Sequence, residues 1–493
     1  MTRRSLLLAG SVATVLIGTA APARAENLID VYLAAVRSDP VLREAEMRKM
    51  AALEAKPQAR GLLLPQVGLT GQYATRETES ESTFTQSVDH DDDDTTPNVI
   101  VQVPNDSKSD SDFWTYEAQI TQSLFRWDQW QALKRADATV AVAEANYRAA
   151  QQDLLVRVST AYFDVLAAED TLSAAQATLE ALTRQLEQAD KRFEVGLIAI
   201  TDVQEARAAH DNATAGVIAA KRTLATTQEV LRELTNETYT TLAKPAEQMP
   251  LDAPSPADEQ GWVDRALEEN LSVIAARLET EVASRDVKVA RAGHYPTVDL
   301  FASRSKFDAD TTATNNGLTG PADSNDTQDT IGVQVSVPIF SGGATQSRVR
   351  ESVYLHRASR EKLEGTMRAA ERETRDAYLG VLAERARVQA LAQAVKSSQT
   401  ALEATEAGFE VGTRTTVDVL ASRRTLFEAQ RDYARSRYDY LINIVRLESA
   451  AGGLVQDDLA TINNFLTAPT TLPNVRPKTP AAPAPTTPPP PAG

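Results

Sequence analysis

Two similar stretches decide how this chain is organised: FEVGLIAITDVQEARAAHDNA, residues 193–213, and FEVGTRTTVDVLASRRTLFEA, residues 409–429. Both read F-E-V-G, then a short variable segment, then D-V. Gly196 and Gly412 suit the position just beyond a helix, where glycine adopts a left-handed conformation that other residues avoid. Each stretch therefore predicts the tip of a helical hairpin, and the chain contains the motif twice.

Long helices are predicted before both tips. No proline or glycine occurs from residue 106 to 195, and no proline from 339 to 468. From Tyr147 to Phe193, apolar residues recur alternately four and three positions apart, which predicts a coiled-coil helix. The second half repeats this pattern with some polar interruptions before Phe409. Shorter return helices are predicted to open at residues 201–202 and 416–418.

Four further segments have apolar residues at every second position. In one of them, Trp114, Tyr116 and Ile120 alternate with polar side chains. Segments of this kind, apolar on one face and small or polar on the other, are typical of transmembrane barrel strands. A globular sandwich is the alternative, but it explains poorly why very long helices flank the strands. The predicted strands cover residues of about 65–76, 113–125, 296–306 and 330–340.

The charge of the chain argues against nucleic acid as a partner. Its 493 residues carry a formal net charge of -17, whereas binding to phosphates needs a basic face. Most of this charge falls in two predicted loops, 77–112 and 308–329. DHDDDD, residues 89–94, lacks the glycine and the closing glutamate of an EF-hand loop, so a solvated external loop is expected there.

The first residues, MTRRSLLLAGSVATVLIGTAAPARA, predict an export signal over 1–25. They contain two arginines, an apolar core and an A-x-A cleavage site. An uncleaved membrane anchor is the weaker interpretation, because the apolar run is short. The chain has no cysteine, which excludes disulfides, cysteine metal sites and a lipid anchor on an N-terminal cysteine.

The predicted elements form an internal duplication. Each repeat contains helix, strand, acidic loop, strand, long helix, tip and return helix. A proline-containing linker joins the repeats, and a proline-rich tail, disordered from about residue 469, follows the second. The boundaries are 26–240 for the first repeat, with its tip at 193–203, 241–257 for the linker, 258–453 for the second repeat, with its tip at 409–418, and 454–493 for the tail.

Four strands in one chain cannot close a barrel. An open sheet edge cannot lie in lipid, because each unpaired backbone group there costs several kcal/mol. Two copies would supply eight strands and a filled interior, whereas three copies would supply twelve strands and a lumen. The sequence therefore predicts a homo-oligomeric conduit, with a mouth in the outer membrane and a periplasmic barrel of helices.

Several motifs resemble the TolC family of outer-membrane efflux proteins, over residues 26–466. The resemblance implies a mixed membrane protein, a trimer in which four strands per chain form one twelve-stranded outer-membrane β-barrel, continued by a periplasmic α-helical coiled-coil barrel. It also implies an exit duct for type I secretion or tripartite multidrug efflux. The implied partners are a periplasmic adaptor, an inner-membrane ABC or RND-type transporter and exported proteins or drugs. The motifs are GHYPTVDL (293–300), VSVPIFSGGATQSRV (335–349), FEVGTRTTVDVL (409–420) and YDYLINIVRLESAAGGLVQDDL (438–459).

The resemblance also implies a gate at the tips, where Arg414 would reach Thr201 and Asp202 on the other hairpin. Such a link would contribute about 1 to 3 kcal/mol. The alternative is a surface pair of negligible energy. Phe409 departs from the family, in which a tyrosine commonly stands at this position, so the latch would rest more heavily on Arg414.

Asp418 is expected, on the same resemblance, to form an acidic ring at the pore constriction. Such rings select and bind cations. The family's second aspartate is replaced here by Ala421, so weaker cation block is expected. The alternative for Asp418 is an acid that stabilises a helix N-terminus, and both roles are compatible.

No enzyme motif, cofactor motif or metal-ligand spacing is found. The chain contains no G-x-S-x-G, H-E-x-x-H or P-loop sequence, and its four histidines lie on different predicted elements. The remaining alternative to a channel is a pore-less coiled-coil surface protein or periplasmic adaptor. The four strand segments argue against it, because an adaptor needs no barrel in lipid.

Overall fold

The computed structural model describes residues 26–88, 99–239, 241–246 and 249–466. The predicted export signal, the DHDDDD segment and the tail from residue 467 lie outside these ranges. No helix in the described part of the chain combines the length and the apolar character needed to cross a bilayer.

The two halves of the chain contain the same order of elements. The first half contains α1 (Leu28–Ser38), α2 (Pro40–Leu53), α3 (Ala55–Gly61), β1 (Gln66–Val88), β2 (Val99–Phe125), α4 (Trp127–Glu194) and α5 (Ile200–Thr235). The second contains α6 (Glu259–Glu269), α7 (Leu271–Ala292), β3 (Thr297–Asn315), β4 (Leu318–Pro321), β5 (Ser324–Ser336), α8 (Ala344–Glu410) and α9 (Thr416–Ala450). The order helices, strands, long helix and return helix thus occurs twice, and α10 (Gln456–Leu466) follows.

The chain forms two compact units. The sheet unit combines residues 44–149 and 267–370. The hairpin unit combines the described parts of 1–43, 150–266 and 371–493. The long helices α4 and α8 each begin in the sheet unit and end in the hairpin unit.

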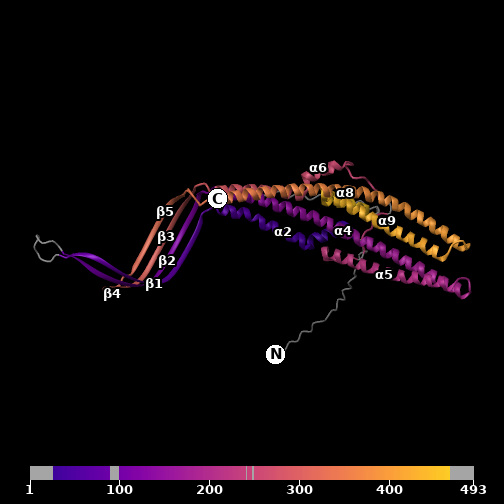
Figure 1. Cartoon of the computed structure of the whole chain (residues 1–493), viewed down its shortest axis with the longest axis horizontal. Helices are drawn as coiled ribbons and strands as arrows, with labels where there is room; N and C mark the ends of the chain where they lie inside the picture. The colour runs from indigo at the N-terminus through magenta and orange to yellow at the C-terminus, as the bar shows by residue number, and fades with distance from the viewer. Residues whose placement is uncertain (1–25, 89–98, 240, 247–248, 467–493) are drawn as a thin grey trace, which may run out of the picture. The chain divides into compact units, whose positions relative to one another are not determined.

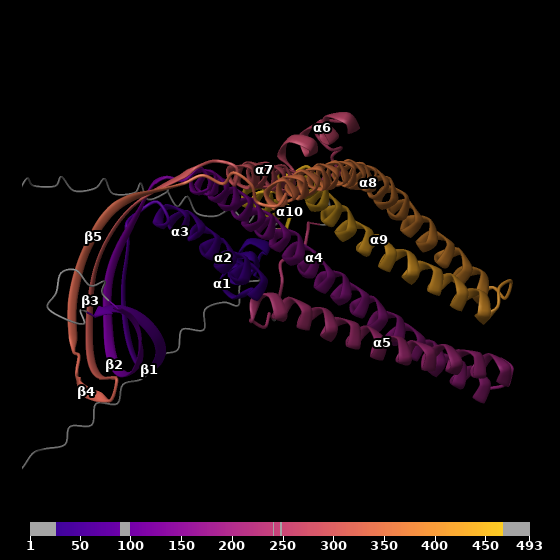
Figure 2. The same cartoon turned by 60° about the vertical axis from the view of Figure 1, so that its left-hand side comes forward.

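The sheet unit contains one antiparallel sheet with open outer edges. β1 pairs with β2, β2 with β3, and the other edge of β3 pairs first with β5 and then with the short β4. Figures 1 and 2 show the strands running side by side and curving together. No other described strand pairs with the outer edge of β1 or of β5, so a single chain leaves both edges unpaired.

The strands extend well beyond the predicted segments. β1 has 23 residues and β2 has 27, and they remain paired as far as Val88 opposite Val99, through most of the segment expected to be an acidic loop. Backbone pairing does not require an apolar face, so it continues where the apolar alternation ends near Tyr73. β5 instead ends at Ser336, shortly before Pro338, and a proline cannot donate a hydrogen bond to the ladder.

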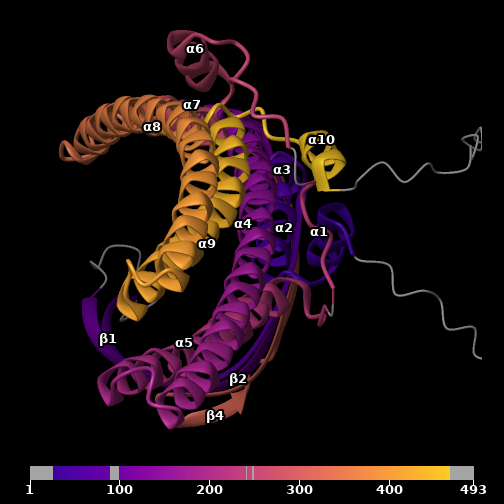
Figure 3. The same cartoon turned by 90° about the vertical axis from the view of Figure 1, so that its right-hand side faces the viewer.

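In the hairpin unit, each long helix pairs with its return helix. Figure 3 shows α5 running back along α4 and α9 running back along α8. The core of this unit is centred on α4, where Tyr162 and Phe163 are fully buried. The Tyr162 hydroxyl donates a hydrogen bond to the Ala243 carbonyl at 2.7 Å, and the Phe163 ring stacks on Tyr438 of α9. This core holds the bases of the two hairpins together.

The first part of the predicted tail is ordered as α10. Leu459, Ile462 and Leu466 are buried, and their spacing of three and four residues is that of a helix with one apolar face. The Asn463 side chain accepts a hydrogen bond from the Leu28 backbone N–H at 3.2 Å, which ties α10 to α1. The tail predicted over 454–493 was expected to be disordered from about residue 469, and α10 at 456–466 precedes that part.

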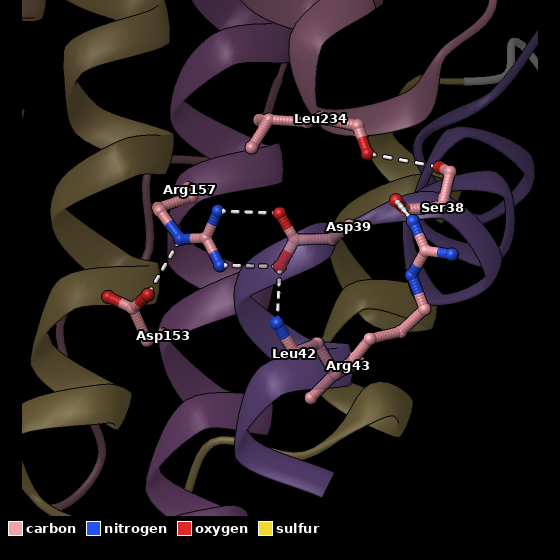
Figure 4. A network of polar contacts seen from close by, with 7 residues as sticks. All are labelled: Ser38, Asp39, Leu42, Arg43, Asp153, Arg157 and Leu234. Carbon is pink, nitrogen blue, oxygen red and sulfur yellow. Dashed lines mark hydrogen bonds and ion pairs between the residues drawn. The ribbon is translucent and has the colours of Figure 1, made fainter. Parts of the chain in front are cut away.

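A buried ion pair joins the first helices to α4 (Figure 4). The carboxylate of Asp39, between α1 and α2, accepts hydrogen bonds from both terminal nitrogens of Arg157, at 3.1 and 3.0 Å. Its Oδ2 also accepts from the Leu42 backbone N–H, and Arg157 bonds Asp153 in addition. Burial alone would raise the pKa of Asp39, but these hydrogen bonds and the Arg157 charge bring it below its usual value.

Candidate gate at the hairpin tips

The two tips have the same backbone geometry. Gly196 and Gly412 adopt left-handed φ angles of 77° and 79°, as expected for residues that end helices. Leu197 N–H donates to the Arg192 carbonyl, and Thr413 N–H to the Gly408 carbonyl, both at 2.8 Å across five residues. The repeated F-E-V-G motif therefore encodes the same helix end twice.

Asp418 caps the start of α9. The hydroxyl of Thr415 accepts a hydrogen bond from the Asp418 N–H at 3.2 Å, and the Asp418 carboxylate accepts from the Thr415 N–H at 2.9 Å. These hydrogen bonds with Thr415 lower the pKa of Asp418. The role as a helix-start acid is confirmed, whereas the ring at a pore constriction stays a prediction.

The first tip lacks this capping box. Its N-cap residue is Ala199, which has no side-chain oxygen to offer. Asp202 stands three residues after Ala199, just as Asp418 stands three residues after Thr415. The pair of hydrogen bonds that joins Thr415 and Asp418 therefore has no counterpart between Ala199 and Asp202.

Arg414 is exposed at the second tip and does not meet its predicted partners within one chain. In the described ranges its guanidinium forms no hydrogen bond or ion pair, with Thr201, Asp202 or any other residue. Its aliphatic part packs over Gly408, where an added Cβ would lie only 2.8 Å from the Arg414 Cγ. The latch from Arg414 to Thr201 and Asp202 thus stays a prediction.

Phe409 contacts the other hairpin through its ring. Its ring packs against a buried apolar cluster that includes Leu402, Val419 and Leu426. The guanidinium of Arg192, on α4, lies 5.1 Å from the centre of the Phe409 ring. This distance is within the range of a cation–π interaction, so phenylalanine still links the two tips. No motif in the sequence marks Arg192.

Arg423 is a second link between hairpins that no sequence motif marks. From α9 its Nη2 donates to Glu406 of α8 at 2.5 Å, and its Nη1 approaches the Ala181 carbonyl of α4 at 3.5 Å. Arg423 and Glu406 line a cleft of about 540 Å³ between the hairpins, with Arg184 and Arg192 on the facing helix. Arg423 lies about one and a half turns beyond Asp418, and the packing of α4 against α9 adds the Ala181 carbonyl to its partner Glu406 on α8.

The chain matches one protein family in both of its halves. Residues 31–237 and 262–453 match the family described as "Outer membrane efflux protein". The chain is 37% identical to "Outer membrane protein TolC" of Escherichia coli (strain K12), over 94% of this chain and 90% of that protein. It is 28% identical to "Alkaline protease secretion protein AprF" of Pseudomonas aeruginosa, over 90% of this chain and 88% of that protein.

Solved structures share the fold. The outer membrane protein VceC from Vibrio cholerae superposes with a TM-score of 0.67 at 21% sequence identity, covering 86% of this chain and 96% of VceC. The open state of the MtrE outer membrane channel from Neisseria gonorrhoeae gives a TM-score of 0.62 at 20% identity, covering 87% of this chain and 89% of MtrE. At these identities the likeness concerns the fold alone.

Proposed function

Because this chain belongs to the outer membrane efflux protein family, we propose that it is a passive exit duct with its mouth in the outer membrane and its hairpins in the periplasm. Three copies would join their sheets into one twelve-stranded barrel and their helices into a tunnel below it. The duct does no chemistry of its own and is not an enzyme. The alternative of a pore-less adaptor is set aside, because it accounts neither for the family match nor for the sheet.

One observation carries this proposal: the sheet has an apolar face, a polar face and two open edges. On the apolar face, Leu69 and Ile331 have exposed fractions of 78% and 79%. On the other face stand residues such as Gln72, Thr115 and Gln334. Lipid on the first side and a water-filled lumen on the second would satisfy both faces. The open edges must then be joined to other copies.

The gate is proposed to lie at the hairpin tips. Arg414 is exposed and forms no hydrogen bond or ion pair with the described residues, although its charge helps to lower the pKa of Asp418. Asp202 has no reciprocal cap. We expect Arg414 of one copy to bond Thr201 and Asp202 of a neighbouring copy, with a contribution of about 1 to 3 kcal/mol per link. Asp418 would point into the lumen and form a single acidic ring, since Ala421 supplies no second one.

Partners and cargo follow from the family. The name of AprF assigns it to secretion of an alkaline protease, and the matched family is described by efflux. We propose that this duct receives exported proteins or small drugs from an inner-membrane transporter of the ABC or RND type. A periplasmic adaptor would join that transporter to the hairpin tips and open the gate.

Single-channel current in a planar bilayer tests the gate. The purified wild-type protein is expected to show a small, steady conductance. Arg414→Ser removes the proposed latch, so its conductance is expected to rise severalfold. Arg424→Ser is the matched control, because Arg424 is also exposed near this tip but pairs with Glu428 on its own helix.

Two results would contradict parts of this proposal. A large conductance in both the wild type and Arg414→Ser would retain the duct and move its gate elsewhere. No conductance in any of the three proteins would reject the duct itself.

A further inference from the structure

Three aromatic rings end the apolar band on the apolar face of the sheet. Tyr73 of β1 lies 4.8 Å from Trp114 of β2, and Trp114 stacks on Tyr116 at 5.9 Å, both measured between ring centres. All three side chains are about half exposed. Between the rings and the helical ends of the strands, this face carries apolar residues such as Leu69 and Ile120. Aromatic rings of transmembrane barrels gather at the level of the lipid headgroups.

Two basic side chains stand on the same face beside these rings. Lys306 of β3 is directly opposite Tyr116, and Arg304, two residues nearer the helices, is opposite Ala118. Lys108 is the remaining basic residue on this face of the described strands. It lies beyond the rings and is bound to two glutamates of β1. Arg304 and Lys306 are therefore the cations at the limit of the apolar band.

Acidic side chains on this face lie farther from the helices along β1, β2 and β3. Asp308 and Asp310 follow Lys306 on β3, Asp112 precedes Trp114 on β2, and two glutamates follow Tyr73 and Thr75 on β1. The charge along β3 therefore changes from positive to negative at the limit of the apolar band. Anionic headgroups at this level would be attracted by the cations and kept from moving outward by the acids.

The two cations are paired only with exposed carboxylates. The Nε of Arg304 lies 3.6 Å from Oδ1 of Asp329 on β5, and the exposed fractions of these side chains are 70% and 68%. This distance is too long for a hydrogen bond, so the guanidinium forms none with the described residues. The Nζ of Lys306 lies 2.7 Å from Oδ2 of Asp308 on its own strand. Exposed pairs contribute little energy, so a phosphate can take the place of the carboxylates.

A cleft of about 420 Å³ opens in the apolar face beside Arg304. Ala302 lies in it, between Ile120 of β2 and Ile331 of β5 in the register of the sheet. The small side chain of Ala302 leaves a groove between these two larger ones, and Arg304 stands at the end of the groove away from the helices. Apolar walls with a cation at one end suit an acyl chain that carries a phosphorylated headgroup.

We propose that Arg304 and Lys306 bind a phosphate of lipid A, the phosphorylated glycolipid of the outer leaflet, with one acyl chain in the groove over Ala302. The site lies at the end of the apolar band away from the periplasmic helices, so a lipid at this level belongs to the outer leaflet. A guanidinium fork and an ammonium together match the oxygens of a phosphate monoester. The inference rests on the orientation of the proposed duct and adds a lipid that the duct binds.

Native mass spectrometry of the purified, delipidated protein tests the site with diphosphoryl lipid A as the probe. Arg304→Gln combined with Lys306→Gln is expected to raise the dissociation constant about tenfold, because both phosphate partners are lost. Lys108→Gln is the matched control and should bind as the wild type does, since Lys108 is exposed on the same face but lies outside the site. All variants should retain the wild-type conductance.

The groove is tested without a change of charge. Ala302→Leu fills the space between Ile120 and Ile331 and is expected to weaken the binding of lipid A severalfold. Phosphatidylglycerol is the second probe and should bind severalfold more weakly than lipid A, because it carries a phosphodiester and no phosphate monoester. Inorganic phosphate in excess should displace little lipid A, because it has no acyl chain.

Three results would overturn the site while leaving the duct intact. They are equal affinity in the wild type and the Arg304→Gln, Lys306→Gln variant, an equal loss in Lys108→Gln, and phosphatidylglycerol bound as tightly as lipid A. All residues of the site belong to one chain, so its failure is distinct from that of the duct. A protein that binds lipid A but conducts no current would retain the site and reject the proposed function.

Discussion

Asp39 lies at the junction of α1 and α2, and only 2% of its side chain is exposed. Its partner Arg157 is partly shielded as well, and it would be left without this counter-charge if the carboxylate were removed. Asp39→Asn is expected to lower the free energy of unfolding by about 3 kcal/mol, because breaking a buried pair strands the remaining ion. Denaturant unfolding measures this change. Asp153→Asn, at an exposed carboxylate on the other side of Arg157, should cost less than about 1 kcal/mol.

The same residue makes stability depend on pH. The pKa of Asp39 is lower in the folded protein than in the unfolded chain, where it is about 3.9. The ionised carboxylate therefore contributes its full stabilisation of the fold at pH values above the unfolded pKa. The contribution is lost as pH falls through the lower, folded value. The unfolding midpoint of the wild type should therefore fall more steeply below about pH 4 than that of Asp39→Asn. Parallel curves for the two proteins would show that Asp39 does not titrate in this way.

Residue by residue, the sequence indicated which groups gather at the tips but not all of their contacts. It identified Phe409 and Asp418. In the structure, Phe409 packs against an apolar cluster and Asp418 forms a capping box with Thr415. Arg192 and Arg423 were missed because their contacts with the other hairpin, to Phe409 and to the Ala181 carbonyl, join residues far apart in the sequence. No local pattern marks such a contact.

At the scale of elements, the left-handed glycines determine where the long helices end. Gly412→Ala is expected to destabilise the hairpin unit by about 1 to 2 kcal/mol, because alanine is strained at a φ of 79°. Gly365→Ala, in the middle of α8, should instead stabilise the helix by up to about 1 kcal/mol, since an added methyl group there meets no other atom within 4 Å. Thermal unfolding of the two variants checks both signs. Equal effects would contradict the role assigned to the tip.

The helices were predicted more accurately than the strands. A heptad pattern sustained from Tyr147 to Phe193 leaves little choice, and α4 ends one residue beyond it. The strands overlap the predicted segments, but they continue further upward, and β5 ends at Ser336 instead of near residue 340. Beyond Tyr73 both faces are polar, so side-chain alternation no longer reveals a ladder that the backbone continues to make.

At the scale of the whole molecule, the proposed trimer depends on the free edge of β5. Ala322 N–H donates to the Thr311 carbonyl of β3, so even-numbered positions along β5 direct their N–H groups toward β3. Val333 is odd-numbered, so its N–H points to the free edge of β5. Val333→Pro should leave the sheet of one chain intact and weaken the trimer, since proline is tolerated on a strand edge but cannot pair there. Unboiled outer-membrane samples should lose the slow-migrating trimer band in gel electrophoresis. Val337→Pro, just beyond β5, is the control and should retain that band.

The sequence by itself determined the local features: the heptad helices, the tips marked by glycine, the alternating strand segments and the duplicated order of elements. These features depend on residues within one or two turns of each other, so their signals are written in short stretches. Only the tertiary structure decided which strands pair and in what register, that α10 packs on α1, and that Arg192 and Arg423 join two hairpins. Apart from the pairings of β1 with β2 and of β3 with β4 and β5, those contacts connect distant parts of the chain, as Leu28 with Asn463, and their geometry arises from the packing of whole elements.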